Sequence, residues 1–111
     1  MPFDHSENLR QKSHRLIPGG CHTYAKGDDQ YPKLSPGFIR GGCGCHVWDM
    51  DRNKYIEYGM GLRAVTLGHA FPSVIAAVSR QSASGSNFTQ PSPIEVECAE
   101  RFLAITARPR W

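Results

Sequence analysis

Hydrophobic and polar residues alternate in short blocks, and the clearest blocks lie between residues 38 and 58. Two largely apolar runs, His46-Val47-Trp48 and Tyr55-Ile56-Glu57-Tyr58, flank a polar turn over residues 49–54. Aromatic and β-branched residues suit a pleated surface, while aspartate and asparagine favour turns because their side chains bond nearby backbone amides. The pattern predicts a β-hairpin with a loop longer than two residues. Phe38-Ile39-Arg40 predicts a third strand, so we expect an antiparallel meander over residues 38–58.

Residues 4–16 predict a first helix, whose apolar stripe is too thin to be stable without a partner surface. Asp4 followed by Glu7 resembles a capping box, which would satisfy amide groups of the first turn. Pro18-Gly19-Gly20 ends this helix, because proline lacks a backbone donor and glycine frees the dihedral angles. We expect irregular chain from Cys21 to Gly37, and loops of this length are usually functional or disordered.

Two further helices are predicted in the last third of the chain. Pro72 suits a first helical turn, and apolar residues then recur at helical spacing over residues 72–81. A loop of small polar residues follows. Ser92-Pro93-Ile94-Glu95 is a capping box with proline at the first helical position, and it predicts a helix over residues 93–106. The tail, residues 107–111, predicts no further element.

Composition and charge narrow the class of protein. The chain has 111 residues, of which 40% are hydrophobic and 21% charged, and its net charge is +3. No run of Lys or Arg concentrates this charge, so we expect no nucleic-acid partner. No apolar stretch approaches the roughly 20 residues that span a bilayer, and the N-terminus has no apolar signal core, so we expect a cytoplasmic protein. Thin apolar stripes and 11 glycines favour the leading segment of a larger protein.

Four cysteines, Cys21, Cys43, Cys45 and Cys98, prompt a search for a metal site. Cys43-Gly44-Cys45-His46 resembles half of a zinc site, which Cys21-His22 could complete. Structural zinc sites usually have two to four residues between paired cysteines, and one residue separates this pair. We interpret the cysteines as free thiols and expect no metal ligand, with a Cys/His metal-binding domain as the weaker alternative.

Five motifs follow one another in the order of a known family. They are Pro18-Gly19-Gly20, residues 44–51, Tyr55-Ile56-Glu57-Tyr58, residues 67–72 (Leu-Gly-His-Ala-Phe-Pro) and the helix with Glu95 to Glu100. Together they resemble the N-terminal part of the class III aminotransferases, a family that includes the glutamate-1-semialdehyde aminomutases. The resemblance implies an α/β fold, the type I fold of pyridoxal-phosphate (PLP) enzymes, and a homodimer.

The resemblance also implies a function for the complete enzyme. Such an enzyme moves an amino group between an amino acid and an aldehyde or keto substrate, with PLP on a lysine as electron sink. The chain's four lysines, Lys12, Lys26, Lys33 and Lys54, do not match the context of that lysine. We therefore expect no catalytic residue and no complete catalytic domain within residues 1–111, no covalent PLP on this chain, and no activity of the fragment alone. The alternative is a non-catalytic module with an interaction role.

The resemblance marks a few residues as contacts for substrate and cofactor. Leu62 stands where many relatives carry an aromatic residue that faces the substrate, and Arg63 follows it. Lys26 stands where the aminomutases place a carboxylate-binding arginine, although lysine lacks arginine's bidentate fork. We therefore expect substrate contacts, to a small amino donor and a carbonyl acceptor, at these three residues. Ser86 and Asn87 lie in a loop that packs near the cofactor phosphate in the family, and are expected to contact PLP.

His69 has two interpretations. As an active-site acid or base it would need a partner, and the sequence shows none. We therefore interpret His69 as a residue at the start of a helix whose ring bonds the backbone. Trp48 and Tyr55 are interpreted as packing residues of the sheet.

Overall fold

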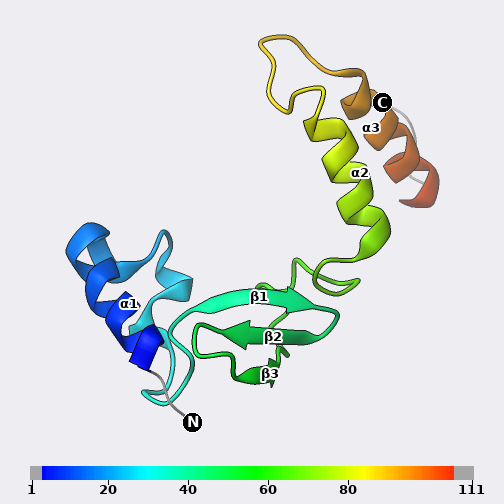
Figure 1. Ribbon diagram of the computed structural model, residues 1–111. Helices are drawn as coiled ribbons and strands as arrows, with labels where there is room; N and C mark the ends of the chain where they lie inside the picture. Colours follow the sequence, from blue (N-terminus) through cyan, green and yellow to red (C-terminus); the bar gives the residue numbers. More distant parts are fainter. Residues whose placement is uncertain (1–3, 107–111) are drawn as a thin grey trace. The chain divides into compact units, whose positions relative to one another are not determined.

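The computed structural model describes residues 4–106. The chain divides between Ile75 and Ala76 into two compact units. The first unit contains helix α1 (Asp4–Leu16) and a three-stranded antiparallel sheet in the order β1-β2-β3 (Figure 1). The strands are β1 (Ile39–Cys43), β2 (His46–Asp49) and β3 (Lys54–Ile56). Three short 3-10 turns, Pro18–Gly20, Tyr24–Lys26 and Asp28–Gln30, interrupt the otherwise irregular chain between α1 and the sheet.

Helix α2 (Pro72–Ser82) begins in the first unit and continues into the second, which also contains α3 (Pro93–Thr106). The predicted capping residues begin α3, since the Glu95 carboxylate accepts the Ser92 N–H at 2.9 Å. Neither helix contains a buried residue. The predicted tail, residues 107–111, lies outside the described residues. The α/β fold class, with a helix, an irregular loop, a small antiparallel sheet and two helices, is confirmed.

The first strand differs from its prediction. The pattern placed it at Phe38-Ile39-Arg40, but β1 begins at Ile39 and continues through Gly41 and Gly42 to Cys43. Glycine is a poor strand former, so the sequence gives no signal that the strand continues through Gly41 and Gly42. A Cβ on Gly42 would lie 2.7 Å from Cγ of His69, so glycine permits a close approach that any other residue would block.

The hairpin of β2 and β3 is organised around Asp49, whose residue exposure is 0%. Its Oδ1 accepts the N–H groups of Asp51 and Asn53 at 2.9 and 2.8 Å. Its Oδ2 accepts the Asn53 side-chain amide at 2.8 Å and the Tyr55 hydroxyl at 3.0 Å. Tyr55, which the sequence pattern predicts as a packing residue, therefore donates a hydrogen bond to the buried turn. Burial acts to raise the pKa of Asp49, but these hydrogen bonds outweigh it and the pKa is lowered.

The same hairpin caps α1. The Asp51 carboxylate accepts the N–H groups of His5 and Ser6 at 2.9 and 3.0 Å, which are first-turn donors with no partner inside the helix. The capping box predicted from Asp4 and Glu7 is therefore wrong, because Glu7 contacts Arg10 and Gln11 instead. The loop between β2 and β3 thus holds the N-terminus of α1 against the sheet.

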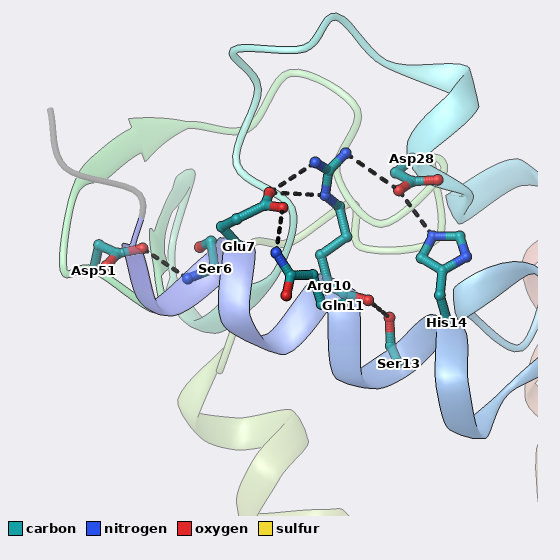
Figure 2. A network of polar contacts seen from close by, with 8 residues as sticks. All are labelled: Ser6, Glu7, Arg10, Gln11, Ser13, His14, Asp28 and Asp51. Atoms are coloured by element: carbon teal, nitrogen blue, oxygen red, sulfur yellow. Dashed lines mark hydrogen bonds and ion pairs between the residues drawn. The ribbon is translucent and has the colours of Figure 1, made fainter.

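A polar network on α1 holds the irregular segment that follows it (Figure 2). Arg10 pairs with Glu7 at 2.7 Å and lies 3.5 Å from Oδ2 of Asp28. Nε2 of His14 lies 2.9 Å from the same Asp28 oxygen. The hydrogen bond with His14 is the largest cause of the lowered pKa of Asp28. Because Asp28 lies two positions after Lys26, this network fixes the stretch of chain that carries the lysine.

Candidate functional site

The site is built where the chain leaves β3. Glu57 is the first residue after that strand, and its N–H still bonds the Cys45 carbonyl at 2.9 Å. Its side chain, 29% exposed, points to the loop that follows. Oε1 accepts the N–H of Gly61 at 2.9 Å, and Oε2 pairs with Nε2 of His69. One carboxylate therefore binds the sheet edge to two points of the loop over residues 57–69.

Four consecutive residues of this loop have positive φ. The values are 40° for Met60, 58° for Gly61, 58° for Leu62 and 70° for Arg63. The Arg63 N–H bonds the Gly59 carbonyl at 2.8 Å, so the segment is a left-handed turn, which we call the left-handed turn 60–63. Such backbone costs about 1–3 kcal/mol for each non-glycine residue and persists only where its surroundings hold it.

His69 is fixed by its backbone as well as by its ring. It exchanges two backbone hydrogen bonds with Gly44, with N–O distances of 2.9 and 2.8 Å. Gly44 lies in the connection between β1 and β2, so the sheet and the end of the loop are joined here. The His69 side chain is 21% exposed and lies against Gly42. The ring is thereby aimed at Glu57 by two separate parts of the sheet.

The charge of Glu57 is favoured by its surroundings. The N–H of Gly61 is the largest cause of the lowered pKa of Glu57; desolvation opposes it, and His69 and the Lys26 charge lower the pKa further. An ionised carboxylate only accepts hydrogen bonds, so Nε2 of His69 is the donor in this pair. Lys26 is near enough for its charge to act on Glu57, although it lies 31 positions earlier in the chain.

The three expected substrate residues all lie in the first unit. Leu62 and Arg63 are exposed on the left-handed turn 60–63, and Lys26 is exposed on the 3-10 turn Tyr24–Lys26. Glu57 bonds the backbone of that turn at Gly61, and the Lys26 charge lowers the pKa of Glu57. Ser86 and Asn87 belong to the second unit, in the exposed loop between α2 and α3. Their role stays a prediction.

The interpretation of His69 is wrong in one respect. Its ring does not bond the backbone; it bonds the carboxylate of Glu57, and this is the partner that sequence reasoning did not find. Glu57 was assigned only to a strand. The available signal was an acidic residue directly after a strand and before two glycines, Gly59 and Gly61, which permit the chain to turn back.

No metal site is found in the part of the chain that the structure describes, where no three Cys, His, Asp or Glu side chains gather suitably. Cys43 and Cys45 are exposed free thiols, and Sγ of Cys45 lies 3.7 Å from Nδ1 of His46. Within residues 4–106, no helix is long and apolar enough to cross a membrane.

Known proteins resemble this chain in sequence and in fold. The chain is 35% identical over 105 residues to a glutamate-1-semialdehyde 2,1-aminomutase of Fusobacterium nucleatum, a match that covers 95% of the chain and 24% of that protein. A solved transaminase with PLP bound superposes with a TM-score of 0.82 at 30% identity, over 94% of this chain and 24% of its own. The FumI protein of Sphingopyxis sp. MTA144, solved in its PLP internal aldimine form, gives 0.86 at 30%, over 97% and 26%.

The chain is homologous to the N-terminal part of the PLP-dependent aminotransferases. This confirms the resemblance that the five motifs of the sequence indicate. PLP is the cofactor of these structural relatives. No protein-family profile matches the chain. The chain spans about a quarter of the length of the curated relatives it matches, since the F. nucleatum alignment covers 24% of that protein.

Proposed function

We propose that this chain is the N-terminal segment, without a complete catalytic domain, of a PLP-dependent aminotransferase or aminomutase. The reaction moves an amino group between an amino acid and an aldehyde or keto substrate. The observation that carries the proposal is the match over 95% of the chain to an aminomutase, together with PLP-bound structural relatives at TM-scores of 0.82 and 0.86. The complete enzyme is proposed to be a cytoplasmic homodimer, and the fragment alone to be inactive.

When bound, PLP supplies an electron sink for bonds at the amino-bearing carbon. The role of the residues in this chain is to attract and orient the substrate. Lys26 is an exposed cation whose charge acts on Glu57, and Arg63 is an exposed cation two positions after Gly61, whose N–H bonds the same carboxylate. An anionic substrate group in front of these two cations gains charge-assisted contacts. Leu62, exposed beside Arg63, leaves room for a bulkier carbonyl acceptor than an aromatic residue would.

Ser86 and Asn87 are proposed to contact the cofactor phosphate. Both side chains are exposed, and a hydroxyl and an amide are suitable donors to phosphate oxygens. The residues therefore have the chemistry that the group requires. Substitution of both residues by alanine should weaken the retention of PLP, measured by dialysis of the purified enzyme. The structure of the first unit should not change.

A non-catalytic interaction module is the alternative, and the exposure of apolar side chains on α2 and α3 favours it. Val74, Ile75 and Val78 of α2 are 45–56% exposed, and Phe102 of α3 is 60% exposed. Apolar surface of this extent usually marks a contact with another protein surface. In the proposed enzyme, the remainder of the polypeptide covers it.

The native protein decides between these functions. We expect the polypeptide that carries this chain to absorb visible light through bound PLP, and an amino acid donor to convert this spectrum to that of the amine form of the cofactor. A carbonyl acceptor should then restore it. A native polypeptide that carries no PLP, and whose spectrum no amino donor changes, would favour the interaction module.

A further inference from the structure

Among the described residues, the side chain of Glu57 links the left-handed turn 60–63 to the edge of the sheet. The turn's own backbone bonds, from Arg63 to Gly59 and from Val65 to Met60, give the turn its shape. They do not determine how it is aimed, because both partners lie in the same loop. The bond from the Gly61 N–H to Glu57 links the turn to the residue that directly follows β3.

Glu57 is itself held from the other side. Nε2 of His69 donates to the second oxygen of Glu57, and the backbone of His69 is paired with Gly44 in the connection between β1 and β2. The contact with His69 therefore fixes the Glu57 carboxylate relative to the sheet, independently of its hydrogen bond with the Gly61 N–H. Two hydrogen bonds at different oxygens leave it little rotational freedom.

We propose that Glu57 is a positioning residue that, oriented by His69, aims Leu62 and Arg63 at the substrate and so sets the preference for anionic substrates. This inference rests on the proposed function and deepens it. The structural basis is the junction of Glu57, Gly61 and His69 behind a strained turn whose two exposed side chains are the expected substrate contacts.

Loss of the Glu57 carboxylate should free the turn, while Leu62 and Arg63 themselves remain in the chain. In Glu57→Ala both links are absent, so the non-glycine residues of the turn can relax to ordinary dihedral angles and Arg63 loses its direction. In Glu57→Gln the amide oxygen can still accept the Gly61 N–H. Its NH₂ can donate to Nε2 of a His69 that carries its proton on Nδ1. The conservative variant should therefore restore most of the geometry.

The first measurement follows the turn itself, by hydrogen exchange at the Gly61 amide in the 111-residue chain. We expect exchange at least tenfold faster in Glu57→Ala, within about threefold of the original in Glu57→Gln, and unchanged in the control Glu100→Ala, an exposed carboxylate of α3. A Gly61 amide that exchanges equally fast with and without the Glu57 carboxylate would overturn the proposal.

The second measurement uses the complete enzyme and two substrates that differ only in a carboxylate. Glu57→Ala should raise KM for the anionic substrate about tenfold, change its kcat by less than about threefold, and leave the uncharged substrate nearly unaffected. Glu57→Gln should behave like the original enzyme. Equal losses for both substrates would contradict a role in aiming Arg63. If the unaltered enzyme performs no amino transfer, the proposed function fails, while the exchange measurement still decides on the link between Glu57 and the turn.

Discussion

Two residues of the first unit, Leu62 and Arg63, combine an exposed side chain with a strained backbone. Leu62 and Arg63 have φ values of 58° and 70°, and both side chains are exposed. Strain of this kind persists where the surroundings over-determine the backbone, and it is concentrated at functional sites. Here Glu57 and His69 supply the constraint, so the two exposed side chains are presented in a defined direction.

Arg63 and Lys26 are predicted to differ in their contribution to substrate binding in the complete enzyme. Arg63→Ala should lower kcat/KM for anionic substrates roughly ten- to a hundredfold, as expected for one charge-assisted contact of about 1.5–3 kcal/mol. Lys26→Ala should lower it less, because its charge already interacts with Glu57 and a flexible ammonium is a weaker anchor. Steady-state kinetics with a charged and an uncharged substrate tests both, and equal losses for the two substrates would indicate a disordered loop.

At the scale of elements, the hairpin of β2 and β3 is the unit on which the other parts depend. Its turn is built on the buried Asp49, and its loop carries the Asp51 carboxylate that caps α1. Glu57 directly follows its last strand and bonds the backbone of the left-handed turn 60–63. A change in the hairpin should therefore affect α1 and the candidate site together.

Asp49→Asn should open the hairpin locally. The variant places an amide NH₂ where Asp49 accepts hydrogen bonds from Asn53 and Tyr55, so at least one charge-assisted bond is lost. We expect the Asp51 and Asn53 amides to exchange about ten- to a hundredfold faster, roughly 1.5–3 kcal/mol of local stability. Asp29→Asn is the matched control, because Asp29 is exposed. Unchanged exchange in Asp49→Asn would show that the buried carboxylate does not organise the turn.

The cap of α1 should depend on pH. The pKa of Asp51 is lowered from its ordinary 3.8; desolvation opposes the shift, and the bonds from His5 and Ser6 outweigh it. A lowered folded-state pKa means that the stabilising contribution is complete above pH 3.8 and is lost as the pH falls through the still lower folded-state value. The Ser6 amide resonance should therefore shift in this acidic range and not near neutrality. Asp51→Asn should abolish that titration, and a Ser6 shift that survives in the variant would have another origin.

The elements that were predictable carry local signals, and the missed features depend on contacts between distant residues. The β2–β3 hairpin follows from a polar turn between apolar runs, and α3 from the Ser92–Glu95 pair. The cap of α1 comes from Asp51, 45 or more positions away, which no local pattern reports. Likewise the partner of His69, Glu57, lies 12 positions earlier, across a left-handed turn for which Gly59 and Gly61 are the sequence signal.

At the scale of the whole molecule, the two units differ in how much they bury. Among the described residues, Val47 is the buried hydrophobic side chain, and it belongs to the first unit. The helices α2 and α3 bury no residue. A helix of this length gains most of its stability from tertiary packing, so the second unit depends on surfaces that it does not itself provide.

The isolated chain should therefore lose its structure in stages. Amides of β2 and β3 should exchange slowly, while those of α2 and α3 should exchange near the rate of an unstructured peptide, because few apolar contacts oppose their opening. Hydrogen exchange read by mass spectrometry on the 111-residue chain measures both regions at once. Equal protection in both units, lost in a single cooperative transition, would contradict this prediction.

We infer that this chain belongs to an enzyme whose PLP-binding lysine lies elsewhere in the polypeptide. Borohydride reduction of the native protein, followed by digestion and mass spectrometry, tests it most directly. We predict that one lysine carries the cofactor in stoichiometric amount, that its peptide lies outside residues 4–106, and that the same polypeptide yields the peptides of this chain. Stoichiometric labelling of Lys12, Lys26, Lys33 or Lys54, or no labelled lysine at all, would contradict the account.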